Sequence, residues 1–343
     1  MDSSAPILIC VTPIKNESSN LAYFLELASG WADRIVLLDQ CSTDNSLEIA
    51  RRFEKVTILH NEAKEYDERY RAGRLIDAAR EIAGRRIIFA LDADEMLSAN
   101  FRECSEWGRV LAAAPGTVIR MDRLGIHPDK RRYWVDVPHM PLGFVDDGSP
   151  FAGTVIHTTR IPLPPHAPVL ELQDIKALHM AYLDVAKLES KVRWYQCWEA
   201  LNGRKNPISS FRYYSAGLPG TVSPAKLAPI EDRWLDEDGR AWIEAVTRNQ
   251  TTGNSRAETE AYWWDAQVID WMRSYGTERF GRLPIWDADW GAIGEKLGLR
   301  AFAIKDPRTW TERAVHCWLL GTRSGPSARF VRLADRLLQG IYK

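Results

Sequence analysis

The chain has 343 residues, of which 45% are hydrophobic and 27% are charged, a composition typical of a globular protein with a substantial buried core. Its 45 basic and 46 acidic residues nearly cancel, so no overall field favours nucleic acid as a partner. Five scattered cysteines form neither a disulfide framework nor a zinc-site spacing, which favours a reducing compartment.

Four apolar runs alternate with helical patterns over the first hundred residues. The predicted strands are 7–11, 34–39, 56–59 and 86–91, and the predicted helices between them are 21–28, 47–53 and 72–83. Strands that are apolar throughout and alternate with helices predict a parallel sheet covered on both faces. Ligands of such sheets bind beyond the carboxyl ends of the strands. The polar residues cluster at those ends, at 12–17, 39–44 and 92–95.

An acidic segment follows the fourth predicted strand, where Asp92 and Asp94 are separated by one residue. Side chains two apart in an extended chain point the same way, so these two carboxylates are expected to converge on one cation. Magnesium and manganese favour such oxygen ligands and typically bind one or two carboxylates together with substrate phosphates. A solvated loop or helix start is the usual explanation of an isolated pair, but its position after four alternating strands favours a metal site.

Three segments in this order resemble motifs of the family 2 glycosyltransferases, which have the GT-A fold. Thr12–Glu17 is similar to the P-x-x-N-E segment of that family, Asp39–Ser46 to its D-D-G-S-T-D turn, and Asp92–Asp94 to its D-x-D motif. The resemblance covers residues 7 to about 100. It implies transfer of a sugar from a nucleotide-diphosphate donor to an acceptor hydroxyl, with inversion and with Mn²⁺ or Mg²⁺ as cofactor.

The resemblance also implies roles for individual residues. Asp39 would accept a hydrogen bond from the nucleotide base, and Asp94 would be the direct metal ligand. The nucleotide-sugar contacts that it implies are Thr12, Pro13, Glu17, Asp39 and Asp92, with Asp92 also close to the metal.

This chain departs from the family pattern at Gln40 and Cys41, where Asp and Gly are usual. Gln40 leaves the identity of the nucleotide undetermined. Cys41 implies that the turn cannot rely on the freedom of glycine at positive φ. Arg71 and Arg74, on the helix that leads to the acidic strand, are candidates to reach a phosphate or the base. Solvent exposure with a salt bridge explains each of them equally well.

The middle of the chain is expected to form an acceptor-facing half with strands at 117–122, 133–137 and 154–158. Inversion requires a carboxylate that deprotonates the incoming hydroxyl and stabilises charge at the anomeric carbon. Asp147 is the preferred candidate, with Asp146 beside it, and a plain Asp-Gly turn is an equally weighted alternative. Three further aspartates stay open as the base: Asp122, Asp136 and Asp174.

His179 follows a short apolar segment and precedes a predicted helix that begins near Val185. Many GT-A enzymes supply their last metal ligand from such a segment, so the resemblance implies that His179 coordinates the cation. A lone histidine is also often structural or exposed, and both interpretations are kept.

The last third is rich in tryptophan and helical in its periodicity, and buried core is the default role of these aromatics. The basic amphipathic segment 328–342 is expected to dock on the protein, with binding to an anionic membrane that carries a lipid-linked acceptor as the alternative. The N-terminus does not resemble a signal peptide, and no apolar run approaches the ~20 residues that span a bilayer. We therefore expect a cytoplasmic protein, either free or peripheral to the inner face of a membrane.

These patterns predict an α/β fold, a GT-A-like Rossmann-type mixed sheet flanked by helices with a largely helical C-terminal portion. The expected domains are a catalytic domain, 1–203, with a nucleotide-sugar half, 1–115, and an acceptor half, 116–203, followed by a Trp-rich region, 204–343. The predicted partners are a nucleotide-diphosphate sugar and a glycan or lipid-linked glycan acceptor. The alternatives are a sugar-phosphate nucleotidyltransferase, which usually needs a glycine-rich loop that 12–20 lacks, and a non-catalytic glycan- or nucleotide-sugar-binding module.

Overall fold

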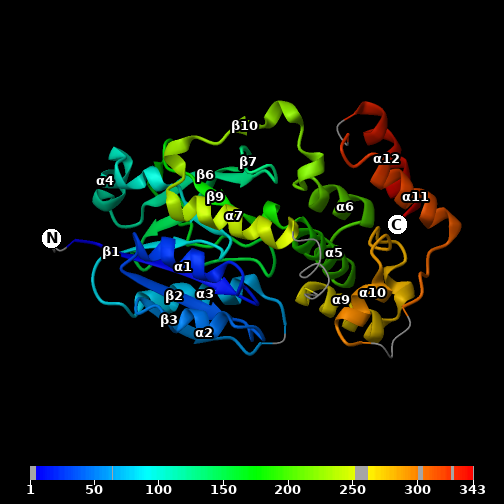
Figure 1. Ribbon diagram of the computed structural model, residues 1–343, viewed down its shortest axis with the longest axis horizontal. Coiled ribbons are helices and arrows are strands. Elements are labelled where there is room, and N and C mark those ends of the chain that lie inside the picture. The colour runs from blue at the N-terminus through cyan, green and yellow to red at the C-terminus, as the bar shows by residue number, and fades with distance from the viewer. Residues whose placement is uncertain (1–4, 64, 252–261, 300–303, 326–327, 343) are drawn as a thin grey trace. The chain divides into compact units, whose positions relative to one another are not determined.

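The computed structural model describes residues 5–63, 65–251, 262–299, 304–325 and 328–342. Tertiary contacts divide the chain into two compact units (Figure 1). The first unit comprises Met1–Met180 with Ala228–Val246, and the second comprises Ala181–Leu227 with Thr247–Lys343. The domain boundary at residue 203 stays a prediction.

The first unit is built on one mixed sheet of ten strands, whose order is β3-β2-β1-β4-β7-β6-β9-β5, with β8 beside β6 and β10 beside β7. The strands are β1 Ile7–Ile14, β2 Arg34–Asp39, β3 Val56–His60, β4 Arg86–Ala90, β5 Glu95–Leu97, β6 Val118–Ile126, β7 Arg132–Val145, β8 Val169–Glu171, β9 Ala177–His179 and β10 Ala228–Pro229.

The register of the first four strands brings their carboxyl ends to one edge of the sheet. These strands are parallel, and Asp39 at the end of β2 lies beside Ile14 of β1 and His60 of β3. Strand β7 runs antiparallel to β4, and its last residues pair with the amino-terminal half of β4. On its other side, β7 pairs with β6 from Tyr133 to Phe144.

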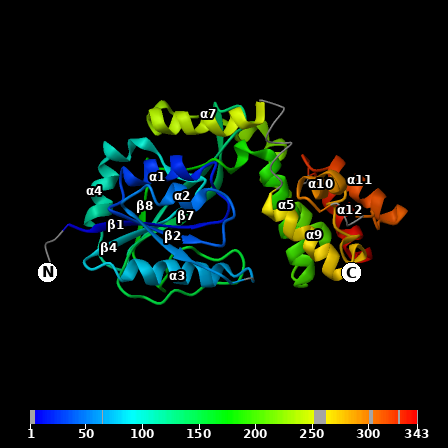
Figure 2. The same cartoon turned by 60° about the horizontal axis from the view of Figure 1, so that its bottom comes forward.

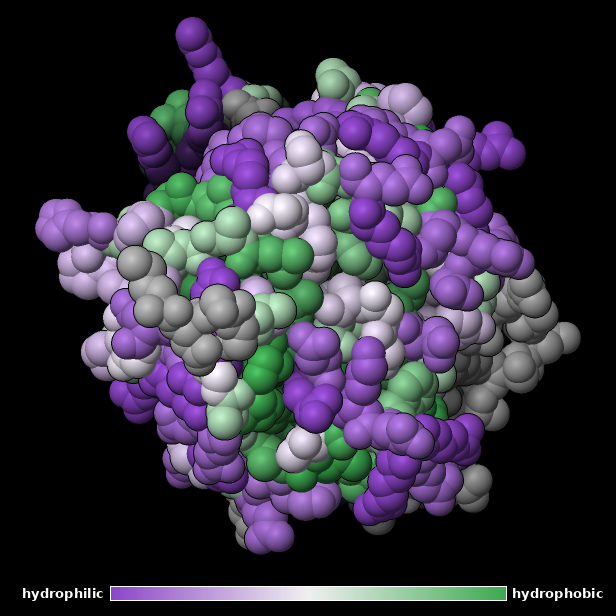
Figure 3. All heavy atoms as spheres, turned by 90° about the vertical axis from the view of Figure 1, so that its left-hand side faces the viewer, coloured by the Kyte–Doolittle hydropathy of each residue, from purple (hydrophilic) through white to green (hydrophobic). Residues whose placement is uncertain are grey.

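Helices cover both faces of the sheet, as Figure 2 shows for α1 and α2 on one side and α3 on the other. A continuous core of side chains such as Val11, Val36, Ile76 and Ile88 lies between α3 and the strands. The helices of this unit are α1 Leu21–Ser29, α2 Ser46–Ala50, α3 Glu68–Arg80, α4 Ser105–Ala112 and the start of α7 Glu237–Thr251. The face drawn in Figure 3 carries mostly hydrophilic side chains, with smaller groups of hydrophobic ones between them.

The second unit is helical, and tryptophans form much of its interior. Trp194 of α5 is fully buried and packs edge-on against Trp264 of α9, with ring centroids 5.1 Å apart. The helices are α5 Val185–Leu201, α6 Pro207–Ser215, α9 Trp263–Tyr275, α10 Trp290–Lys296, α11 Trp310–Gly321 and α12 Arg329–Ile341. Among the described residues, no helix combines the length and apolar character needed to cross a bilayer. Short 3₁₀ turns lie at Ala99–Arg102 and Asp232–Trp234 in the first unit, and at Ala181–Leu183, Pro219–Thr221, Pro224–Lys226 and Thr277–Phe280 in the second.

The predicted mixed α/β sheet flanked by helices and the helical C-terminal portion are confirmed. The predicted strand at 154–158 is wrong, because this segment is irregular. The Thr154 hydroxyl donates to the carbonyl of Ile156, and its backbone N–H donates to the Thr158 hydroxyl. His157 between them has a φ of 56°, so the chain turns where the apolar pattern predicted an extended segment.

Candidate functional site

The loops after β1 and β2 are bonded to each other at the carboxyl edge of the sheet. The backbone N–H of Asn16 donates to the Ser42 hydroxyl at 2.9 Å, and the N–H of Thr43 donates to the Asn16 side-chain oxygen at 2.7 Å. The N–H of Ser18 donates to the Asp44 carboxylate at 3.0 Å. The first two predicted motifs therefore form one connected rim.

Asp39 is the buried centre of this rim, with 2% of its surface exposed. Its carboxylate accepts the N–H of Ser42 at 3.1 Å, and the imidazole Nδ1 of His60 lies 3.8 Å away. Cys41 has a φ of 56°, so the turn keeps the left-handed backbone that glycine would adopt without steric cost. The turn therefore adopts a positive φ without glycine, and the cysteine bears the steric cost of that conformation.

The two candidate arginines of α3 have different partners. Arg71 donates from Nη1 to the side-chain oxygen of Gln40 at 2.9 Å and stacks over the ring of Tyr66. Arg74 donates to the hydroxyl of Tyr70 on the exposed side of its own helix. The structure therefore brings Arg71 to the rim beside Asp39 and leaves Arg74 bonded within α3.

The remaining nucleotide-contact candidates lie in or just after β1. Thr12 has no exposed surface, so its hydroxyl is enclosed within the protein. Pro13 is partly exposed, and the Glu17 carboxylate accepts a hydrogen bond from the Asn20 side chain at 3.2 Å. Their contacts with a nucleotide stay predictions.

The acidic segment after β4 is a hydrogen-bonded turn and not an extended strand. The N–H of Glu95 donates to the carbonyl of Asp92 at 2.9 Å, which closes the turn. The carboxylates of Asp92 and Asp94 consequently have different neighbours. Asp92, whose side chain is 33% exposed, pairs with Arg160 at 2.5 Å.

Asp94 lies opposite His179, which the strand pairing brings to the acidic turn. Strands β5 and β9 are antiparallel, with Glu95 directly across from His179, and the N–H of Met180 donates to the Asp94 carbonyl at 2.8 Å. The His179 Nε2 lies 3.6 Å from the Asp94 carboxylate. The His179 Nδ1 lies 3.4 Å from the carboxylate of Asp136 on β7.

Glu95 is a fully buried carboxylate that connects these groups. It accepts hydrogen bonds from Arg160 at 2.5 Å and from Arg123 at 3.0 Å, and Arg123 also pairs with Asp136 at 2.7 Å. Burial would raise the pKa of Glu95, but Arg160 and then Arg123 outweigh it and lower that pKa to about 2. Glu95 is therefore ionised at neutral pH and holds both arginines in place.

The pKa of His179 is raised, whereas that of Glu95 is lowered. Burial and the charge of Arg123 act to lower its pKa, but Asp94 and Asp136 together outweigh them and raise it to about 9. Each nitrogen of the imidazole therefore has a carboxylate neighbour, Asp94 at Nε2 and Asp136 at Nδ1.

Asp146 and Asp147 lie at the opposite edge of the sheet. The N–H of Asp146 donates to the carbonyl of Arg86 at the start of β4, about 20 Å of extended chain before Asp92. Both carboxylate oxygens of Asp146 are occupied, one by Arg80 at 2.9 Å and the other by Arg86 at 2.9 Å. The exposed Asp147 accepts the N–H of Ser149 at 2.9 Å. The structure thus separates both predicted base candidates from the acidic turn.

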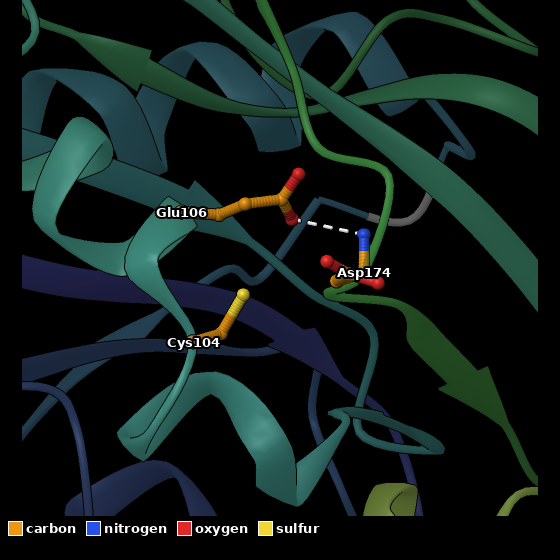
Figure 4. Close-up of side chains that lie close together, drawn as sticks. All are labelled: Cys104, Glu106 and Asp174. Carbon is orange, nitrogen blue, oxygen red and sulfur yellow. Dashed lines mark hydrogen bonds between the residues drawn. The ribbon is translucent and has the colours of Figure 1, made fainter.

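A second acidic group, formed by Cys104, Glu106 and Asp174, has an explanation in the fold (Figure 4). In the described part of the chain it is the one place where three potential metal-ligand side chains have ligand atoms all within 4.8 Å of one another. The Glu106 carboxylate, however, accepts the backbone N–H groups of Gln173, Asp174 and Ile175 at 2.7–3.1 Å. Glu106 therefore stabilises the loop before β9 by satisfying its backbone donors.

Sequence reasoning missed Glu95, Arg123 and Arg160 and left Asp136 among several open candidates. Glu95 adjoins the acidic pair, so its position was a usable clue. Arg160 comes from the irregular segment after β7, where no periodic pattern predicts which side chain points to the sheet.

Comparisons with known proteins agree with the motifs. Residues 9–102 match the model of glycosyl transferase family 2. No curated protein matches the chain. Among solved structures, glucosyl-3-phosphoglycerate synthase from Mycobacterium tuberculosis in complex with Mn²⁺, UDP and phosphoglyceric acid is similar at 17% identity, over 34% of this chain and 43% of that one, with a TM-score of 0.25. A 4-diphosphocytidyl-2C-methyl-D-erythritol synthase is similar at 16% identity, over 35% and 62% of the two chains, with a TM-score of 0.26.

The solved structures therefore correspond to this chain over a limited part only, and the chain spans less than half the length of the synthase in complex with Mn²⁺. The family match, by contrast, contains all three predicted motifs, from Thr12 to Asp94. The predicted resemblance to family 2 glycosyl transferases is confirmed over residues 9–102.

Proposed function

We propose that this chain is a glycosyltransferase that moves a sugar from a nucleotide-diphosphate donor to an acceptor hydroxyl with the help of a divalent cation, Mn²⁺ or Mg²⁺. The acceptor in this proposal is a glycan, either free or lipid-linked, and the enzyme works in the cytoplasm. One observation carries the proposal: the rim around Asp39 and the acidic turn, both in the family-matched segment, lie at the same edge of the sheet, and His179 lies opposite the turn.

The residues of the acidic turn fit a divalent cation. Two ligand atoms on one ion, with bonds of about 2.1 Å, lie roughly 3–4 Å apart, and the Asp94 carboxylate is 3.6 Å from the His179 Nε2. The neighbouring Asp92, Glu95 and Asp136 bring the carboxylates to four, against two arginines and one histidine. An excess of negative charge in a partly buried place favours one more cation.

In this proposal Asp94 and His179 would hold the cation, with the imidazole giving up its proton as the ion binds, and the cation would neutralise charge on the departing diphosphate. Asp39 accepts a hydrogen bond from the nucleotide base, and Arg71, fixed by Gln40, supplies positive charge to the same rim. Arg160 orients Asp92 through their ion pair.

The proposed reaction is a single displacement. The acceptor oxygen attacks the anomeric carbon, the bond from that carbon to the diphosphate oxygen breaks, and the nucleoside diphosphate leaves. The acceptor proton needs a base, and Asp136 is the open candidate that lies beside His179. Asp146 and Asp147 are not proposed for this role, because they lie at the other edge of the sheet.

The test is a donor screen with purified full-length protein that identifies the leaving group. Release of nucleoside diphosphate that depends on Mn²⁺ and on an acceptor is expected. Release of pyrophosphate from a nucleoside triphosphate would instead establish the nucleotidyltransferase. Calorimetric binding of UDP and Mn²⁺ without turnover towards any acceptor would favour the binding module.

A further inference from the structure

Helix α12 is anchored to the rest of the second unit mainly by one side, and the ring of Phe330 at its start also packs edge-on against Trp318 of α11, with ring centroids 5.3 Å apart. Val331 and Tyr342 are buried, and Tyr342 belongs to a core cluster with side chains of α6 and α11. Asp335 lies on the same side and is buried, where its carboxylate accepts hydrogen bonds from Arg212 at 2.8 Å and from the Trp318 indole at 3.2 Å. The predicted docking of this helix on the protein therefore accounts for the side that carries Val331 and Asp335.

The outward side of α12 carries a ridge of large apolar side chains. Phe330, Leu333 and Leu337 are 63%, 61% and 65% exposed. Their spacing of three and four residues aligns them along one line of the helix. They are the only exposed large apolar residues of α12 among its described side chains, and they lie together.

An arginine ridge runs beside the apolar one. Arg329, Arg332 and Arg336 have the same spacing, one residue earlier, and all three are exposed. The single acidic residue of this helix, Asp335, points inward to Arg212. Residues 304–343 contain eight Lys and Arg against three Asp and Glu, although the whole chain has a formal charge of −1.

We propose that the outward side of α12 binds the surface of an anionic lipid bilayer. The apolar ridge would enter the boundary between headgroups and acyl chains while the arginines contact lipid phosphates, the arrangement of helices that lie in a membrane surface. The inference does not rest on the proposed transfer activity.

A second copy of the chain fits this surface less well. Three side chains of this size expose on the order of 400 Å², about half of the ~800 Å² per partner that a stable interface needs. Nucleic acid would use the arginines but would leave the apolar ridge in water.

The test is cosedimentation of the full-length protein with vesicles of phosphatidylcholine alone or mixed with phosphatidylglycerol. Binding to the mixed vesicles that weakens as salt is raised is expected, with little binding to phosphatidylcholine alone. The Arg332→Gln/Arg336→Gln variant is expected to bind roughly ten- to thirtyfold more weakly, and Leu333→Ser/Leu337→Ser at least about tenfold more weakly. Tyr275→Ser is the matched control, because Tyr275 is 61% exposed but lies on α9, and it should bind as the parent does.

Equal binding to both vesicle types, or none, would overturn the proposal, as would full binding by the Leu333→Ser/Leu337→Ser variant. Self-association in solution that this variant abolishes, without lipid binding, would assign the surface to a second copy instead. Circular dichroism checks that all variants are folded. Donor turnover without lipid separates this outcome from the proposed function, since α12 should not affect it.

Discussion

The two edges of the sheet each hold a buried carboxylate between two arginines, yet they differ in what surrounds that carboxylate. At the amino end of β4, the amino edge of the sheet, Asp146 is paired with Arg80 and Arg86, and both of its oxygens are occupied. At the carboxyl end, Glu95 is paired with Arg123 and Arg160 in the same way. Two arginines on one carboxylate therefore do not by themselves mark a functional site.

The difference lies in the charges beyond each pair. The group around Asp146 has more cations than carboxylates, whereas the group around Glu95 continues to Asp92, Asp94 and Asp136 and has more carboxylates than arginines. The backbones differ as well. The amino edge has glycine at a left-handed position, Gly148, while the loop at the carboxyl edge has Cys41 there. An excess of carboxylates together with a strained loop suits a cation-binding site, whereas the two arginines on Asp146 leave no excess of negative charge for a cation.

The largest expected effect is a difference in catalytic rate between substitutions at the two edges. Asp94→Asn removes a proposed metal ligand, so Mn²⁺-dependent release of nucleoside diphosphate should fall by at least about a hundredfold. Asp147→Asn, the matched carboxylate at the amino edge, should leave the rate unchanged. A similar loss in both variants, or in neither, would contradict the assignment of the two edges.

A second activity measurement sharpens the role of the carboxyl edge. Asp136→Asn should lower the rate of transfer by about 10²- to 10³-fold, because a general base would be lost, while UDP affinity measured by calorimetry stays near that of the parent. Weakened UDP binding with an unchanged rate would show that Asp136 only supports the donor site.

A substitution at the amino edge should change the stability of the fold and leave the activity unchanged. Asp146→Asn leaves Arg80 and Arg86 close together without their shared carboxylate, which should lower the free energy of unfolding by about 2–4 kcal/mol. Urea unfolding measures this change, and the rate per folded molecule should be that of the parent. A loss of activity at full stability would move Asp146 into the site.

The two edges should also share an acid sensitivity. The pKa of Glu95 in the folded protein is about 2, below its ordinary 4.5, so its ion pairs stabilise the fold above about pH 4.5, and this stability is lost as the pH falls towards 2. The pKa of Asp146 is lowered as well, because its hydrogen bonds and ion pairs outweigh the effect of burial. In Glu95→Gln, the slope of unfolding free energy against pH should be smaller in this window, and an unchanged slope would contradict the assigned shift.

The smallest effect tests strain at the carboxyl edge. Cys41→Gly relieves a left-handed backbone and loses a 3.4 Å contact from Cys41 Sγ to the Asn61 carbonyl, so a net gain of about 0.5–1 kcal/mol is expected. Thermal unfolding measures it. A destabilised variant would show that the thiol contact outweighs the strain.

The sequence by itself determined the alternation of strands and helices, the edge of the sheet at which the polar motifs gather, and the family of residues 9–102. These properties are local, because apolar periodicity and short motifs are contained in consecutive residues. Asp39, Asp94 and His179 became candidate site residues in this way.

Only the tertiary structure decided which distant groups meet. The antiparallel pairing of β7 with β4 placed Asp146 and Asp147 at the opposite edge from the acidic turn, although their sequence suited a base. The pairing of β5 with β9 put Glu95 opposite His179, and an irregular segment delivered Arg160 to Asp92. These contacts join residues that are 68 positions apart (Asp92 and Arg160) and 84 positions apart (Glu95 and His179), and such residues meet only when the sheet and its loops have assembled.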